Sequence, residues 1–156
     1  MIRLIDVYET FEASGHAVNP QYIKFLYDLL AERPPEAHIS HREMPSFEQH
    51  TAFVLGKPYR AWFLIEAMWQ TLAPALVGAL NVTQWNEIGI FIKRDFWRRG
   101  FAAQAIAQLQ LQLQPLPTVH SVREGRWLAN VAPENEASHA LFKALGAKAV
   151  SITYAL

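Results

Sequence analysis

The residues with the clearest chemical potential lie between Lys93 and Ala103, in the sequence KRDFWRRGFAA. Four cations precede Gly100, and alanines follow at the start of a predicted helix, 102–113. A helix N-terminus presents N–H groups without intrahelical partners and the positive end of a dipole, which together bind anions, phosphates in particular. A glycine here lets the backbone approach a ligand closely. The stretch therefore indicates a phosphate site; the alternative is a basic turn in solvent.

Strands and helices on either side must position this turn. Short β-branched and apolar runs predict strands, whereas caps followed by apolar residues at three- and four-residue spacing predict helices. The order is β-α-α-β-β-β-α-β-α-β, which implies one mixed sheet with helices on both faces. The predicted strands are 2–8, 59–68, 74–82, 87–92, 126–131 and 147–155, and the predicted helices are 20–31, 47–55, 102–113 and 133–146.

Composition narrows the classes of function. A length of 156 residues with 51% hydrophobic residues suits a single domain over 1–156. Equal numbers of basic and acidic residues, 14 each, argue against a general nucleic-acid binder. The lack of cysteine excludes disulfides, zinc–cysteine sites and thiol nucleophiles, and we assign no metal site. Without a signal-like N-terminus or a membrane-length apolar run, we expect a soluble, cytoplasmic protein that binds neither membrane nor nucleic acid.

Two motifs give the chain a resemblance to a known family. The frame from Trp97 to Ala102 resembles the acyl-CoA-binding turn of the GNAT family of N-acetyltransferases: Gln or Arg, two variable residues, Gly, one variable residue, then Gly or Ala. Gly100 and the final alanine match. The tryptophan departs from the pattern, but this change affects a side chain and leaves the backbone cradle intact. Downstream, NEASHALFKALG resembles the family's Asn-x-x-Ser helix, with Asn135 and Ser138 in register.

The resemblance implies a mixed α/β, GNAT-like fold whose central, mostly antiparallel sheet of about six strands is flanked by helices. Acetyl-CoA would lie where strands 87–92 and 126–131 splay apart, with its pantetheine along the first strand and its diphosphate on the turn. The cofactor-binding residues implied in this way are Ile90, Phe91, Ile92, Arg98, Arg99, Gly100, Phe101, Ala102, Ala103, Gln104, Asn135 and Ser138.

Plainer interpretations of some of these residues stay open. Ile90 and Ile92 are equally typical of core positions, although the implied contacts use only their backbone atoms. Asn135 is a typical helix N-cap, and Ser138 is an ordinary residue of a first helical turn.

The family's reaction is attack of a primary amine on a thioester. It needs an acceptor for the ammonium proton and a proton for the leaving thiolate. The resemblance makes Glu87 the general base, and His41 is the alternative because an imidazole titrates near neutral pH. A solvent-facing carboxylate and a loop histidine are the plainer interpretations. The tyrosine that often acts as the acid is replaced by Phe142, which leaves Tyr154 or solvent as the proton source.

The segment between the first strand and the central strands, which sets the acceptor, is rich in aromatic residues and histidines and poor in acidic clusters. This composition favours a small-molecule amine such as an amino sugar or a nucleotide-linked amino sugar over a polyamine or an aminoglycoside. Tyr27, Tyr59, Trp62 and Trp85 would stack on a ring or else belong to the core.

Two alternatives to this function stay open: a protein N-terminal or lysine acetyltransferase, and a catalytically weak acyl-CoA-binding module. Because the predicted sheet ends in an open edge strand at 147–155, we also expect a homodimer that pairs through this edge.

Overall fold

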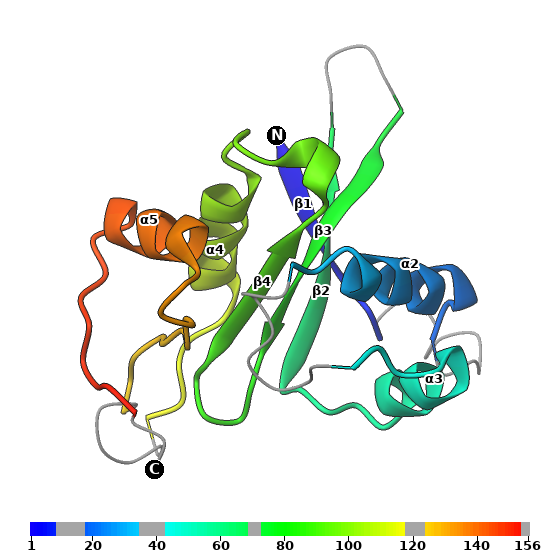
Figure 1. Ribbon diagram of the computed structural model, residues 1–156, viewed down its shortest axis with the longest axis horizontal. Coiled ribbons are helices and arrows are strands. Elements are labelled where there is room, and N and C mark those ends of the chain that lie inside the picture. The colour runs from blue at the N-terminus through cyan, green and yellow to red at the C-terminus, as the bar shows by residue number, and fades with distance from the viewer. Residues whose placement is uncertain (9–17, 35–42, 69–72, 118–123, 154–156) are drawn as a thin grey trace.

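The computed structural model describes residues 1–8, 18–34, 43–68, 73–117 and 124–153. Four strands form one antiparallel sheet in the order β1-β2-β3-β4. Helices α2 and α3 lie on one side of this sheet, and α4 and α5 lie on the other (Figure 1). The elements are β1 (Ile2–Asp6), α2 (Pro20–Ala31), α3 (Phe47–Leu55), β2 (Ala61–Ala67), β3 (Ala75–Val82), β4 (Ile88–Ile92), the 3-10 helix η2 (Arg94–Phe96), α4 (Phe101–Gln112) and α5 (Glu136–Ala144).

The N-termini of α2 and α3 form where their caps predict. The Asn19 side chain accepts a hydrogen bond from the backbone N–H of Gln21 at 2.9 Å, and Pro20 opens the first turn of α2. Ser46 and Gln49 form both bonds of a capping box at the start of α3, at 3.1 and 2.9 Å. These caps confirm the helix starts at 20 and 47 and fix the direction of both helices over the sheet.

The sheet separates two hydrophobic clusters, because successive side chains of a strand point to opposite faces. On one face, Leu80 and Ile88 pack with Leu109 of α4. On the other face, Leu64 and the Trp62 side chain pack with α2 and α3. Strand β4 contributes to both clusters, because Ile88 belongs to the first and Phe91 packs against the second.

The fold class is confirmed, but the sheet has fewer strands than the sequence predicts. In place of a strand at 126–131, the structure has a single parallel bridge between Glu87 and Leu128. Leu128 donates its N–H to the carbonyl of Asn86 at 3.0 Å, and its own carbonyl accepts from Ile88 at 2.7 Å. A parallel ladder needs evenly spaced bonds along both segments, and here pairing stops after one residue. The two segments therefore touch once and then separate.

The predicted strand at 147–155 is also wrong for the residues that the structure describes, since 147–153 form no strand; residues 154–156 lie outside the described part. A strand needs a neighbouring strand to pair with, and 126–131 has only the single bridge at Leu128 and forms no strand. The predicted homodimer has no strand in 147–153 through which to pair, and it stays a prediction.

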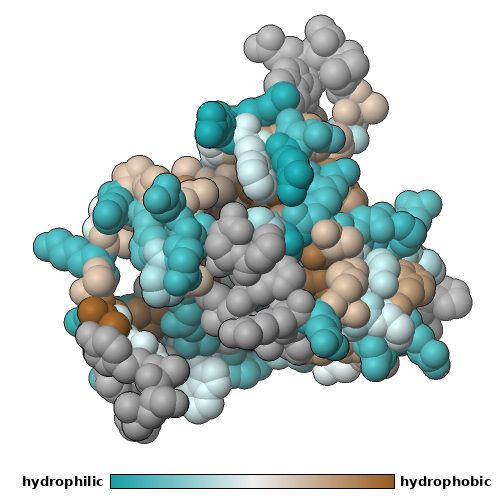
Figure 2. Space-filling model, in the orientation of Figure 1, coloured by the Kyte–Doolittle hydropathy of each residue, from teal (hydrophilic) through white to brown (hydrophobic). Residues whose placement is uncertain are grey.

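Hydrophilic residues cover much of the face that Figure 2 shows, with smaller hydrophobic areas between them. Large hydrophobic side chains that are exposed include Trp85, Leu111 and Ile152. Among the described residues, none of the helices has both the length and the apolar character to cross a membrane.

Candidate active site

The turn between β4 and α4 has a left-handed backbone at two positions. The angle φ is 59° at Arg98 and 75° at Gly100, and α4 begins directly after the glycine without a side-chain cap. A Cβ atom at Gly100 would have only the Gln104 Nε2 atom within 4 Å, at 3.8 Å. Because a first helical turn directs its N–H groups out of the helix end, the turn presents backbone donors to open space.

Positive charge surrounds this helix end. The side chains of Arg98 and Arg99 are exposed, and the Arg99 guanidinium stands 5.6 Å from the ring centre of Phe96. The Arg94 guanidinium stands 5.7 Å from the ring centre of Trp97. Such contacts hold cations near aromatic faces. Backbone donors, the helix dipole and arginines thus come together as the sequence predicts for an anion site.

The backbone of β4 alternates between its partner strand and the open side of the sheet, as in any antiparallel edge strand. Thr83 N–H donates to the carbonyl of Glu87 at 2.9 Å, and Lys93 N–H donates to the carbonyl of Val77 at 2.8 Å. This register directs the backbone of residues 87, 89, 91 and 93 toward β3. The predicted backbone contact of Phe91 with a ligand is therefore wrong, because its N–H and C=O belong to the sheet.

The even-numbered residues of β4 direct their backbone groups to the open side. Ile88 gives its N–H to Leu128 at 2.7 Å, and the carbonyl of Ile92 accepts from the Trp97 indole Nε1 at 2.7 Å. Within the described residues, Ile90 keeps both its N–H and its C=O without a partner. The strand therefore offers a short row of backbone groups, centred on Ile90, to an extended ligand.

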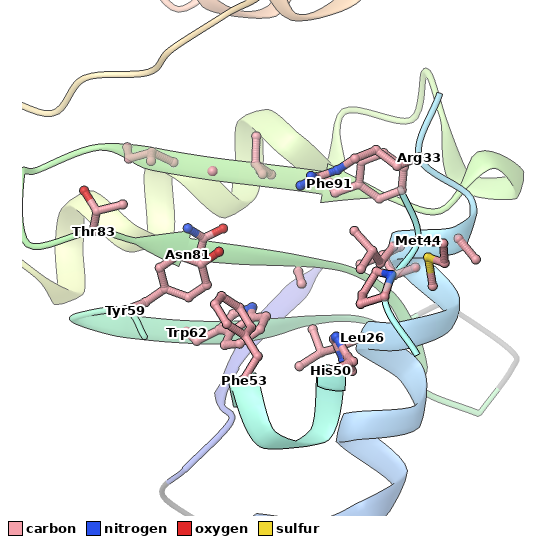
Figure 3. A pocket seen from close by; sticks show the side chains of 18 of the residues that line it. Leu26, Arg33, Met44, His50, Phe53, Tyr59, Trp62, Asn81, Thr83 and Phe91 are labelled. Atoms are coloured by element: carbon pink, nitrogen blue, oxygen red, sulfur yellow. The ribbon is translucent and has the colours of Figure 1, made fainter. Parts of the chain in front are cut away.

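A pocket of about 800 Å³ lies between α2, α3 and the face of β2, β3 and β4. Figure 3 shows Phe53 and His50 rising from α3 toward side chains of the sheet. The aromatic rings of Tyr59 and Trp62 meet edge to face, with centroids 4.8 Å apart. The aromatic lining residues are Phe53, Tyr59, Trp62 and Phe91, and the polar ones are Arg33, Glu43, Gln49, His50, Asn81, Thr83, Glu87 and Asn130. A mostly apolar pocket with a few polar groups is typical of a small-molecule site.

Glu87 lines this pocket at the point where β4 begins. The Thr83 hydroxyl donates to its carboxylate, Oγ1 to Oε2, at 3.4 Å, and accepts a hydrogen bond from the Glu87 backbone N–H at 3.2 Å. The carboxylate is partly buried and stands next to the bridge where the segment around Leu128 leaves β4. A proton acceptor is thus placed at the start of the gap between the two segments.

The preceding residue, Asn86, fixes this arrangement. It is fully buried and adopts a left-handed backbone with φ of 61°. Its side chain donates to the carbonyl of Leu116 at 2.9 Å and accepts from the N–H of Leu116 at 2.7 Å, while its own carbonyl accepts from Leu128. Asn86 therefore ties the strand start to two other segments, to Leu116 through its side chain and to Leu128 through its carbonyl, next to Glu87.

Charge at the other end of the pocket comes from Arg33. Its guanidinium lies 5.9 Å from the ring centre of Phe91 (Figure 3), and burial lowers the pKa of this arginine from its ordinary value. Burial raises the pKa of the Tyr59 hydroxyl, and the positive charge of Arg33 opposes the rise. The pocket thus has a carboxylate near one end and a guanidinium near the other.

The last helix contributes a cap and a core contact. The Asn135 side chain accepts from the N–H of Ser138 at 3.1 Å and so caps α5, which leaves its amide NH₂ for other partners. Phe142 is partly buried against the cluster on the α4 face. It has no proton to give, as the sequence indicates. Of the other candidates, His41 and Tyr154 lie outside the described residues.

Residues of this site that sequence reasoning missed include Arg33, His50, Asn81 and Asn86. A weak signal existed for His50, which stands four residues before Val54, and these two are the buried residues of α3. Of the aromatic residues expected to stack on the ring of an acceptor, Tyr59 and Trp62 line the pocket, and Trp62 also belongs to the hydrophobic core. Trp85 is exposed and does not belong to the pocket lining.

Comparisons with known proteins agree with this arrangement. A family model described as an acetyltransferase (GNAT) domain matches residues 19–148. Among curated proteins, a search by sequence finds no match.

Several solved structures share the fold at low sequence identity. A spermidine N-acetyltransferase chimera from Vibrio cholerae has a TM-score of 0.63 and 15% identity, over 92% of this chain and 78% of that one. An aminoglycoside 6'-N-acetyltransferase from Acinetobacter haemolyticus has a TM-score of 0.59 and 14% identity, over 100% and 96%. A third, AAC(6')-Iy, solved with the bisubstrate analogue CoA-S-monomethyl-acetylneamine, has a TM-score of 0.57 and 20% identity, over 100% and 98%. At these identities the likeness shows the fold.

Proposed function

We propose a function for this chain from one premise: it belongs to the acetyltransferase (GNAT) domain family. It is an acyltransferase, and its cosubstrate is acetyl-CoA. In our proposal it transfers the acetyl group directly to the primary amine of a small molecule while both substrates are bound. The acceptor class is an amino sugar, free or linked to a nucleotide.

The cosubstrate binds along β4 and at the start of α4. Its diphosphate rests on the backbone N–H groups from Arg99 to Ala103, near Gln104, with Arg98 and Arg99 adding positive charge. The left-handed Gly100 supports this placement, because it leaves the helix end uncovered. The pantetheine pairs with the backbone of Ile90, and with the N–H of Ile92, as an added strand would.

Two residues at the start of α5 also contact the cosubstrate in this proposal. The Asn135 amide NH₂, left over by the cap, donates to the pantetheine, and Ser138 stands beside it in the first turn. Phe142 supplies no proton, so the departing thiolate takes its proton from solvent in this proposal.

The chemistry needs one proton acceptor from the protein. The acceptor's ammonium loses a proton to Glu87, directly or through a water, and the free amine attacks the thioester carbonyl. A C–N bond forms, the C–S bond breaks, the nitrogen loses its second proton to solvent to give the amide, and the thiolate is released. The observation that carries the proposal is the position of Glu87, which lines the pocket and stands at the start of the gap between β4 and the segment around Leu128.

The lining of the pocket supports a small acceptor with one ammonium group. Its described acidic residues are Glu87, near the gap, and Glu43, which is exposed, while Arg33 brings a positive charge. This lining lacks the cluster of carboxylates that a polycation such as spermidine would need, and Arg33 would repel one of its ammonium groups. The rings of Tyr59 and Trp62 offer surfaces for a sugar or a base.

The test is a screen for release of free CoA with amino sugars, nucleotide-linked amino sugars, peptides and polyamines. With the amine that is turned over, we expect Glu87→Gln to lower kcat by about 10²–10⁴-fold, because it removes a general base. The dissociation constant of acetyl-CoA should stay unchanged.

Glu43→Gln is the matched control, since it removes a carboxylate from the same pocket but away from the gap, and it should keep most of the activity. Equal rates for wild type and Glu87→Gln with every amine would contradict the assignment of the base. Turnover of peptides alone would contradict the small-molecule acceptor.

A further inference from the structure

We infer that His50 is a specificity-determining residue, which hydrogen-bonds an uncharged polar group on the body of the acceptor. The inference rests on the proposed function and deepens it. It names the substrate class as a hydroxylated ring with one amine, in contrast to polyamines and to amines without hydroxyl groups.

The first support is an unused hydrogen-bonding atom in the pocket wall. His50 is only 4% exposed and lines the pocket from α3. Its Nε2 atom is buried and has no hydrogen-bond partner among the described residues. Buried polar atoms in native proteins nearly always have a partner, so an orphan that borders a pocket indicates a group supplied by a ligand.

The second support is the fixed position of the ring. His50 contacts Tyr27, with ring centroids 5.3 Å apart and planes tilted by 57°. The Tyr27 hydroxyl in turn donates to the carbonyl of Pro45 at 3.0 Å. A ring held in this way cannot swing into solvent to satisfy its nitrogen, so the unpaired atom is a lasting property of the pocket.

The third support is charge. Burial lowers the pKa of His50, and hydrogen bonding to the backbone of Ile23 only partly opposes this. The ring is therefore neutral near pH 7, where it neither repels the ammonium group of an acceptor nor attracts an anion. A neutral imidazole nitrogen is suited to a hydroxyl, which can donate or accept as the tautomer requires.

A second polar group faces the same space from the sheet. Asn81 lines the pocket opposite Gly89 of β4, and a Cβ atom on this glycine would stand 2.5 Å from the Asn81 Oδ1 atom. The glycine thus lets the amide lie across the strand. Figure 3 shows His50 on the helical side and Asn81 on the sheet side, with Phe53 and Trp62 between them.

Two amide or imidazole groups on opposite walls, with aromatic rings between them, match a ring that carries hydroxyl groups on its edge and apolar C–H groups on its faces. A polyamine has neither feature and would need clustered carboxylates. A plain cyclic amine would fit the aromatic rings but leave His50 and Asn81 unpaired, which is costly in a buried site.

The experiment compares two amines of similar ring size, D-glucosamine and cyclohexylamine, in wild type, His50→Phe and His50→Gln. The phenylalanine keeps the aromatic contact with Tyr27 but removes the nitrogen, whereas the glutamine amide restores a polar group near the Nε2 position. We expect His50→Phe to lower the ratio of kcat/KM for glucosamine over cyclohexylamine about tenfold, through KM for glucosamine, and His50→Gln to restore part of it. The dissociation constant of acetyl-CoA should not change.

A readout without turnover makes the test independent of the proposed function. The ¹⁵N resonance of the His50 Nε2 atom should move when glucosamine is added to the wild-type protein, and should stay in place with cyclohexylamine. A ratio that is the same in all three proteins would overturn the inference, as would a resonance that does not respond to glucosamine. If no amine in the screen releases CoA, the proposed function fails, and the resonance alone still decides the role of His50.

Discussion

The backbone at Gly100 gives the sharpest test of the phosphate site. The proposed change is Gly100→Ala, which adds one methyl group at a position with φ of 75°. Left-handed backbone disfavours any residue with a Cβ atom, by about 1–2 kcal/mol. Steric overlap adds little, because the only heavy atom within 4 Å of the new Cβ would be Gln104 Nε2, at 3.8 Å.

The magnitudes follow from these numbers. For a chain of this size, each kcal/mol lowers Tm by about 2–4 °C, so we expect a fall of about 2–8 °C. Relief of the strain would rotate the peptide planes next to Gly100 and turn the first N–H groups of α4 away from the diphosphate. A loss of about 1.4 kcal/mol in binding would raise the dissociation constant of CoA about tenfold.

Gly146→Ala is the matched control. Gly146 has φ of 78°, and a Cβ there would meet nothing within 4 Å, so the strain is the same, but the residue lies after α5. Calorimetric titration with CoA and thermal unfolding would be measured for both variants. Both should lose similar stability, and only Gly100→Ala should lose affinity. Equal dissociation constants for CoA in the two variants would refute the placement of the diphosphate at this helix end.

Two further predictions concern stability. Asn86→Ala should lower the free energy of unfolding, measured by urea titration, by about 2–4 kcal/mol, because the N–H and C=O of Leu116 lose their buried partner and the left-handed backbone becomes strained. Asn86→Gly avoids the strain, so its loss of stability should be about 1–2 kcal/mol smaller. Burial raises the pKa of Tyr8 to about 12, so the neutral phenol stabilises the fold fully below pH 10, and this stability is lost as the pH rises from 10 to 12. Tyr8→Phe should lack this part of the alkaline decline in Tm, and identical declines in both proteins would contradict the burial of the hydroxyl, which donates to the carbonyl of Val54 at 3.0 Å.

Local rules predicted the parts of the fold that depend on neighbours in sequence. The capping box of Ser46 and Gln49 and the Asn19 cap are readable because each uses side chains within three residues. Gly100 is readable for the same reason: a glycine between a basic turn and an alanine-rich helix indicates a helix end that a ligand can approach closely, and the structure adds that its backbone is left-handed. The LQLQ stretch at the end of α4 alternates like a strand, and it continues a helix already begun, as predicted, to Gln112.

The errors come from interactions between distant segments. The RWLANV stretch has the short apolar run of a strand, but it pairs with β4 at Leu128 alone, and local pattern cannot reveal how many rungs a ladder has. The 147–155 prediction then failed over its described part, where 126–131 forms no strand beside which 147–153 could pair. The backbone of Phe91 was misassigned because the register of β3 and β4 decides which residues face the open side.

The site was predictable where backbone geometry defines it and hidden where packing does. The Gly100 turn could be proposed from residue type and position, and Glu87 from the family resemblance together with its position at the start of a strand. His50 becomes notable only when α3 lies against α2 and buries its ring, and Asn81 only when Gly89 stands opposite. Asn86 looks like an ordinary turn residue until its side chain meets Leu116, thirty positions away.

The alternation along β4 also bears on how such an enzyme could change over generations. In the proposed complex the main-chain atoms of Ile90 face the cosubstrate, and a replacement of the Ile90 side chain leaves them in place, so most point mutations there would not change binding of the donor. The Phe91 side chain faces the opposite cavity, where substitutions would be free to drift toward new acceptors, whereas a side chain at Gly89 would meet the Asn81 amide at 2.5 Å. Selection for a new amine acceptor could thus proceed one residue at a time without lowering the affinity for acetyl-CoA.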